Sequence, residues 1–166
     1  MRIEKRNKTS KQIQELQQSA QRFCFLVENI NGYGPSGWLM EISQLLPRIH
    51  SGIGLLDNPS QAECLFSLAD IDERFELFCY LKKFLGKKDS YEVGEELSDN
   101  ELYGSLAEDL VDLYFEIKRG LDLLYADKAN LGAALSLWRD GFFLRWGKHL
   151  IDAERHLYDL RVHRQI

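Results

Sequence analysis

The sequence contains few residues that interrupt helices and no long apolar run. Its three prolines all precede residue 60, so the last 107 of the 166 residues contain none that must break a helix. No uninterrupted apolar run is longer than five residues, the length of the run from Phe23 to Val27, whereas spanning a bilayer takes about 20. The first six residues also lack the apolar segment of a secretory signal. We therefore predict a cytoplasmic chain without a membrane partner.

Cysteines and basic residues are also scarce. Cys24, Cys64 and Cys79 lie among apolar neighbours without a CxxC spacing, which predicts three buried thiols and no disulfide. The 21 basic side chains are outnumbered by 26 acidic ones, so the net charge is -5. Proteins that bind double-helical nucleic acid use clustered lysine and arginine. The composition therefore argues against a nucleic-acid partner.

Leucine is the dominant apolar residue. The chain has 27 leucines against 15 β-branched residues, and leucine loses little side-chain freedom in a helix, whereas β-branched residues favour strands. We predict an all-α fold, a single bundle of five to six helices that run mostly antiparallel, up and down. The bundle is expected over residues 10–161, after a basic N-terminal segment (1–9) and before a C-terminal tail (162–166).

Apolar side chains recur at alternating steps of three and four residues, the spacing of one helix face. These stripes run from Ile13 to Ile30, Leu39 to Ile53, Ile71 to Leu85, Leu102 to Leu124 and Leu131 to Leu157. Residues 86–98 show no such period and predict the longest connection, an acidic interhelical loop. The pattern leaves open whether Ser60 to Leu68 extends the third helix or forms a short helix of its own.

Several residues predict where these helices begin, end or bend. Capping boxes are expected to open the first helix at Thr9 and the fourth at Ser98. Pro47 is expected to kink the second helix or divide it in two. The last helix is expected to run from Asn130 to about Leu160, and Gly141 or Gly147 is expected to bend it.

Two signatures in the second half of the chain resemble a known family. The first is LAEDLVDLY at 106–114, followed by Gly120, and the second begins at Trp138, contains RWGKH at 145–149 and runs to Leu157. Together they are similar to the bacterial family labelled domain of unknown function 5063, which the earlier helices also fit in order. The resemblance implies an all-helical cytoplasmic domain that carries no established activity.

The chain departs from the pattern of that family at two positions. Glu108 replaces the first of two paired aspartates, and Arg145 replaces a histidine. In the family pattern two histidines four residues apart share one helix face, a spacing at which both can ligate one metal ion. Arginine stays protonated and cannot be a ligand, so one half of such a pair is missing here.

Two lines of polar residues run beside the apolar faces of the last two predicted helices. They consist of Asp109, Asp112 and Glu116 in one helix and of Arg145, His149, Asp152 and His156 in the other. Sequential helices with short connections pack antiparallel, so we expect the two lines to face each other. One interpretation is a metal-dependent hydrolase with a carboxylate and histidine site in the bundle.

The other interpretation is a structural network, in which Arg145 pairs with Asp109 or Asp112 and His149 donates to a nearby carboxylate or carbonyl. The carboxylate-bridged metal bundles need Glu-x-x-His on two helices, and this chain has none. Arg145 also keeps a positive charge while removing the ability to ligate. We therefore favour the structural network, with no metal, no cofactor and no catalytic residue.

Acidic residues are concentrated in one stretch of the chain. Ten acids and no lysine or arginine lie between Asp89 and Glu116. The candidate partner surface consists of Asp89, Glu92, Glu95, Glu96, Asp99 and Glu101. An acidic loop on a rigid bundle attracts a basic partner, although a merely solvated loop has the same composition. We predict a non-catalytic protein-interaction module that docks through this surface; the alternatives are the hydrolase and an immunity or inhibitor protein that masks a basic toxin.

Overall fold

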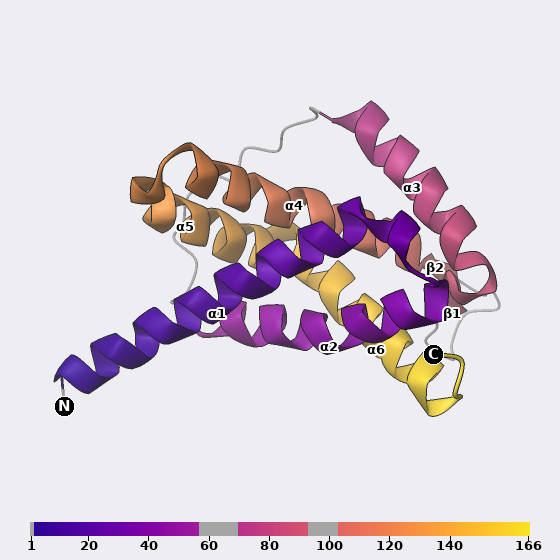
Figure 1. The fold of residues 1–166 in the computed structure, drawn as a ribbon, viewed down its shortest axis with the longest axis horizontal. Helices are drawn as coiled ribbons and strands as arrows, with labels where there is room; N and C mark the ends of the chain where they lie inside the picture. The colour runs from indigo at the N-terminus through magenta and orange to yellow at the C-terminus, as the bar shows by residue number, and fades with distance from the viewer. Residues whose placement is uncertain (1, 57–69, 93–102) are drawn as a thin grey trace.

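The computed structural model describes residues 2–56, 70–92 and 103–166 as a bundle of helices (Figure 1). The α-helices are α1 (Arg2–Glu28), α2 (Pro35–Gly54), α3 (Ile71–Leu85), α4 (Leu106–Ala126), α5 (Leu131–Gly141) and α6 (Gly147–Val162). Shorter turns are η1 (Ile30–Gly32), η2 (Gly86–Lys88) and η3 (Lys128–Asn130), and η4 (Phe142–Trp146) is π-helical. Two short strands, β1 (Ser90–Glu92) and β2 (Tyr103–Ser105), pair antiparallel as a hairpin. The predicted all-α class is confirmed.

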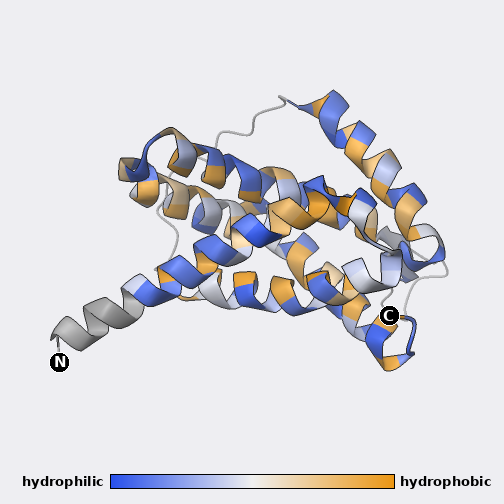
Figure 2. Cartoon of the chain, in the orientation of Figure 1, coloured by the Kyte–Doolittle hydropathy of each residue, from blue (hydrophilic) through white to orange (hydrophobic). Residues whose placement is uncertain are grey.

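Helix α4 lies at the centre of the bundle. It packs against α1, α3, α5 and α6, while α2 packs against α1 and α6. Bands of apolar residues alternate with polar ones along the helices (Figure 2), and the apolar side chains share one core. Its largest fully buried members include Trp38, Trp138, Trp146 and Phe23. No helix in the described part of the chain is both long enough and apolar enough to cross a membrane.

Trp138 of α5 packs directly on the backbone of α4 at Gly120. Its indole Nε1 donates a hydrogen bond to the carbonyl oxygen of Ile117 over 3.0 Å, so a buried donor is satisfied. A β-carbon at residue 120 would overlap the indole ring, and only glycine permits this approach. The contact joins the two signature segments of the sequence, the first through its glycine and the second through its tryptophan.

The N-terminus of α4 is capped by residues that precede it. Ser105 is the N-cap and its Oγ accepts a hydrogen bond from the Glu108 amide. Asp89 accepts two further hydrogen bonds, from the Leu106 amide to its carbonyl oxygen (2.9 Å) and from the Ala107 amide to its Oδ1 (2.7 Å). The prediction that a capping box at Ser98 opens this helix is therefore wrong, because α4 begins eight residues later.

The last predicted helix is divided by a π-helical segment. Helices α5 and α6 follow one another through η4, in which the backbone is more loosely wound than in an α-helix. Gly141 and Gly147 flank this segment. A β-carbon at residue 147 would overlap the carbonyl oxygen of Phe142, so the segment requires glycine at its end. The structure therefore has a π-helical segment between the two glycines at which a bend was expected.

The first two helices differ from their predicted forms. Helix α1 begins at Arg2, so Thr9 lies within it and does not cap it. Helix α2 continues through Pro47 to Gly54 and is not divided. A proline inside a helix removes one backbone hydrogen bond, and here the burial of residues before and after it, such as Leu46 and Ile49, holds both halves in one helix.

Helix α3 has the predicted ends but not the predicted buried face. Asp70 is its N-cap, and Gly86, with φ of 57°, ends it in a conformation that favours glycine. Leu81 and Leu85 are buried, whereas Ile71 and Phe75 are exposed. Only the C-terminal half of the apolar stripe therefore belongs to the core.

The cysteine prediction is correct at one of the two described positions. Cys24 is buried and Cys79 is exposed, because Cys79 lies on the side of α3 away from α4. Burial raises the pKa of the Cys24 thiol to about 12. Cys64 and the segment Ser60 to Leu68 lie outside the described residues. The predicted loop 86–98 contains η2 and β1 in its described part, which the absence of an apolar period did not predict.

Candidate functional site

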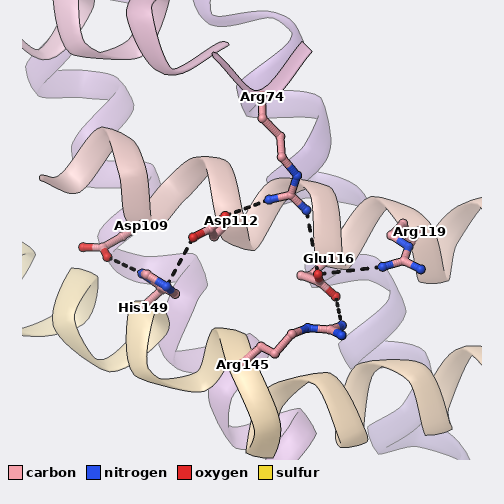
Figure 3. A network of polar contacts seen from close by, with 7 residues as sticks. All are labelled: Arg74, Asp109, Asp112, Glu116, Arg119, Arg145 and His149. Atoms are coloured by element: carbon pink, nitrogen blue, oxygen red, sulfur yellow. Dashed lines mark hydrogen bonds and ion pairs between the residues drawn. The ribbon is translucent and has the colours of Figure 1, made fainter. Parts of the chain in front are cut away.

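The two predicted polar lines meet along the edge of α4 that faces α6 and α3 (Figure 3). Acids at positions 109, 112 and 116 lie on one side of α4 because their spacing is three and four residues. Arg145 of η4 and His149 of α6 approach this side from two consecutive elements, and Arg74 approaches it from α3. We call the following set the α4 network: Arg74, Asp109, Asp112, Glu116, Arg119, Arg145 and His149.

Glu116 is a buried acid of the α4 network, and three arginines surround it. Its side chain is 5% exposed, and its Oε2 accepts a hydrogen bond from Nη2 of Arg145 over 2.7 Å. Its Oε1 lies 3.8 Å from Nη2 of Arg74 and 3.8 Å from Nη1 of Arg119. These cations come from three elements, so one carboxylate ties η4 and α3 to α4.

The expectation that Arg145 pairs with Asp109 or Asp112 is wrong. The two facing elements run antiparallel, so a residue that precedes His149 lies opposite a residue later in α4. His149 faces Asp109 and Asp112, and Arg145, four residues earlier, therefore faces Glu116.

His149 bridges two carboxylates through both nitrogens of its ring. Nδ1 lies 2.8 Å from Oδ1 of Asp109, and Nε2 lies 3.2 Å from Oδ2 of Asp112. The hydrogen bond to Asp109, followed by the negative charges of both aspartates, raises the pKa of the imidazole above its ordinary 6.5, although burial acts in the opposite direction. The ring therefore hydrogen-bonds to Asp109 and lies within ion-pair distance of Asp112.

Arg74 connects the two halves of the α4 network. Its Nη1 donates a hydrogen bond to Oδ1 of Asp112 over 2.7 Å, and its Nη2 lies near Glu116. The guanidinium also stacks over the ring of Phe115, 4.7 Å from the centroid. Polar contacts thus run without a break from Asp109 to Arg145. Arg74 was missed because nothing in the sequence of α3 indicates which of its charged residues faces α4.

The hairpin adds a contact that no sequence pattern indicated. The Tyr91 hydroxyl donates a hydrogen bond to Oδ2 of Asp109, and burial together with this bond raises the pKa of the phenol. Tyr91 crosses directly over Gly104 of the paired strand, where a β-carbon would overlap its ring. The hairpin therefore covers one end of the α4 network.

Two predicted members of the site lie beyond the α4 network. His156 donates from Nε2 to the carbonyl oxygen of Lys88 over 2.7 Å, and its ring stacks on Tyr91 with centroids 4.9 Å apart. Asp152 is half-buried and, among the described residues, makes no hydrogen bond or ion pair with the network. His156 thus holds the hairpin on α6 instead of facing the acids of α4.

The predicted acidic partner surface requires a correction at Asp89. This side chain is 1% exposed, because it accepts hydrogen bonds from Ser105 and from the first turn of α4, so it does not belong to a surface. Glu92 is exposed at the end of β1. The remaining acids of this prediction, Glu95, Glu96, Asp99 and Glu101, lie outside the described residues.

The geometry of the α4 network suits internal neutralisation better than metal binding. Each of its three carboxylates contacts a cationic side chain of the same chain, and guanidinium groups occupy positions that a metal would need. Across residues 2–56, 70–92 and 103–166, no three His, Cys, Asp or Glu side chains are placed to hold a metal ion together. Both ring nitrogens of His149 already lie against carboxylates of the network.

The stability contributed by His149 is expected to fall as the pH rises. A group whose native pKa is raised contributes its full stabilisation below the unfolded-state pKa, about 6.5 for histidine, and loses it as the pH rises through the native pKa. Melting temperatures of the wild type and of His149→Gln should therefore differ most near about pH 6 and less near about pH 9. A difference that widens with rising pH would contradict the charged bridge.

The fold and the α4 network define an all-helical bundle whose signature polar residues pair with one another. The chain belongs to the family described as Domain of unknown function (DUF5063), whose model matches residues 7–163. The fold is similar to that of protein BF1032 from Bacteroides fragilis, known from a crystal structure, with a TM-score of 0.72 and 22% identity over 90% of this chain and 92% of that chain. A search of curated proteins found no match. The predicted family is confirmed, and the likeness to BF1032 concerns the fold alone.

Proposed function

We propose that this protein is a non-catalytic protein-interaction module that docks a basic partner through one acidic segment. This acidic segment contains Glu92, Glu95, Glu96, Asp99 and Glu101. The observation that carries the proposal is the closed state of the α4 network. A catalytic or metal site needs an open position beside its acids or bases, whereas here each carboxylate contacts a cation and His149 contacts two carboxylates. We therefore assign the network a role in stabilising the bundle, and we assign the binding of a partner to the acidic segment.

The two paired strands support this proposal, because they flank the acidic segment in the sequence. Glu92 and Tyr103 are paired neighbours at the open end of the two strands, so the chain leaves the bundle and returns to it at adjacent points. Both residues are exposed, as is Glu108 in the first turn of α4. The four further acids of the predicted surface lie between these points in the sequence. A concentration of one charge on a rigid support favours encounter with an oppositely charged partner.

Of the alternatives, the metal-dependent hydrolase lacks support from the geometry. It requires Asp109, Asp112 and Glu116 to ligate one metal ion. Two of these carboxylates are instead paired with arginine, Asp112 with Arg74 and Glu116 with Arg145. Protein purified without an affinity tag should have the same melting temperature before and after treatment with EDTA. Stoichiometric zinc, iron or manganese that is lost in a His149→Gln variant would overturn the non-catalytic proposal.

The docking part of the proposal is tested by neutralising the acidic segment. In the variant Glu92→Gln, Glu95→Gln, Glu96→Gln, affinity for a lysine-rich peptide should fall, measured by fluorescence anisotropy. The matched control neutralises three exposed acids of α3, Asp72→Asn, Glu73→Gln and Glu76→Gln, and changes the net charge equally. Equal losses in both variants would show that only the net charge of the protein attracts the peptide, and would overturn a specific surface.

A further inference from the structure

Helix α6 has an outward face on which apolar and basic residues alternate. The residues at this face, which we call the α6 stripe, follow at steps of three and four: Lys148, Ile151, Arg155, Tyr158 and Val162. Such steps place them on one side of the helix, over a length of about 21 Å. The three apolar members are exposed by 51%, 65% and 55%. Within the described chain, no other helix covers them.

The α6 stripe borders a groove between α6 and α2. The groove has a volume of about 540 Å³, and Tyr158 and Val162 form part of its wall, together with Pro47 from α2. Leu157 contributes apolar surface, Arg161 adds a positive charge, and Glu154, which contacts His50, adds a negative one. The stripe is therefore an exposed helix face with a concave apolar edge, a shape that accepts the apolar side of a second helix.

The exposed charges of α6 are mainly basic, with Lys148, Arg155 and Arg161 against one exposed acid, Asp159. Among the described residues, Lys148, Arg155 and Arg161 take part in no ion pair, although the protein has a net charge of -5. Arg155 donates only to the carbonyl oxygen of Glu92 and lies over the ring of Tyr91. These cations contrast with the arginines of the α4 network, which are neutralised within the chain.

We propose that the α6 stripe binds an acidic amphipathic helix of a partner protein. The apolar side of that helix packs on Ile151, Tyr158 and Val162 and enters the groove beside α2, while its acids pair with Lys148 and Arg161. Charge complementarity selects this occupant over a second copy of the chain. A two-fold pairing of the stripe with itself sets Arg155 against its own counterpart, and like charges in contact are unfavourable. The proposal goes beyond the acidic segment and does not rest on it.

A synthetic amphipathic peptide of about 18 residues, with leucines along one face and glutamates on both flanks, is the probe for this surface. Fluorescence anisotropy should show saturable binding to the full chain, and a peptide with lysines in place of the glutamates should bind at least about tenfold more weakly. Tyr158→Ser should lower the affinity at least about tenfold. The double variant Lys148→Glu, Arg161→Glu should bind the acidic peptide more weakly and the lysine peptide more strongly than the wild type does.

Tyr125 provides a matched control, because it lies on α4 and is 66% exposed, against 65% for Tyr158. Tyr125→Ser should leave the affinity unchanged, and circular dichroism should show that both variants keep the helical fold. Equal losses in the two serine variants, equal binding of the two peptides, or no saturable binding would each overturn the proposal. Sedimentation that reveals a dimer abolished by Tyr158→Ser would assign the stripe to a second copy and overturn it as well.

Discussion

The Glu116→Gln variant is expected to lose about 3 kcal/mol of stability, measured as the free energy of unfolding in denaturant. Glutamine keeps the shape of the side chain but removes the negative charge that, among the described residues, Arg74, Arg119 and Arg145 share. The loss lies at the low end of the range for buried pairs, because Arg74, Arg119 and Arg145 each keep some access to water. The three guanidinium groups then repel one another more strongly, although Arg74 keeps its ion pair with Asp112.

A control on the same helix separates this effect from any loss of charge on α4. Asp122→Asn removes an acid that pairs with Lys118 over 3.1 Å at the exposed surface, and such pairs contribute about 0–1 kcal/mol. A double-mutant cycle with Arg145→Leu adds a second check, since the arginine substitution should cost less when Glu116 is already neutral. Additive losses would show that the two residues do not interact in solution.

The Gly120→Ala variant is expected to lose about 3–5 kcal/mol of stability. A methyl group at this position overlaps the indole of Trp138, which is almost completely buried. Moving the ring strains the packing between α4 and α5, and it breaks the hydrogen bond from Nε1 to the carbonyl oxygen of Ile117. The buried indole N–H then lacks a partner, whereas the Ile117 carbonyl keeps its hydrogen bond within α4. Chemical denaturation, with near-ultraviolet circular dichroism as the signal of the tryptophans, measures both effects.

The same substitution at Gly132 should have the opposite effect on the free energy of unfolding. Gly132 lies in the exposed first turn of α5, with no atom near the position of an added β-carbon. Alanine favours a helix over glycine by about 1 kcal/mol, so Gly132→Ala is expected to stabilise the protein slightly. If Gly120→Ala were also neutral or stabilising, the close contact with Trp138 would not exist in solution.

Local features of the structure followed from the sequence where the signal itself is local. The C-terminal end of α3 follows from Gly86, whose positive φ is a property of its own backbone. The apolar stripe of α4 follows from its period, because a helix with one apolar side buries that side whatever its neighbours are. These features require no knowledge of which element packs on which.

The features that were missed depend on contacts between distant parts of the chain. The start of α4 depends on Asp89 as well as on Ser105, whereas the capping signal at Ser98 was complete in its own sequence. The partner of Arg145 depends on the register between η4 and α4, which composition does not determine. Arg74 joins the α4 network only because α3 packs on α4. Pairwise polar contacts therefore need the three-dimensional arrangement.

The first amides of α4 are hydrogen-bonded to Asp89, which directly precedes β1 and is not part of α4. The first N–H groups of a helix have no partner inside the helix and normally exchange with water as the end frays. Here the amide protons of Leu106 and Ala107 are held by Asp89, seventeen and eighteen residues earlier. Their hydrogen exchange therefore reports detachment of the hairpin side of the molecule, not fraying of α4. These two backbone positions make the opening of that side visible without any added label.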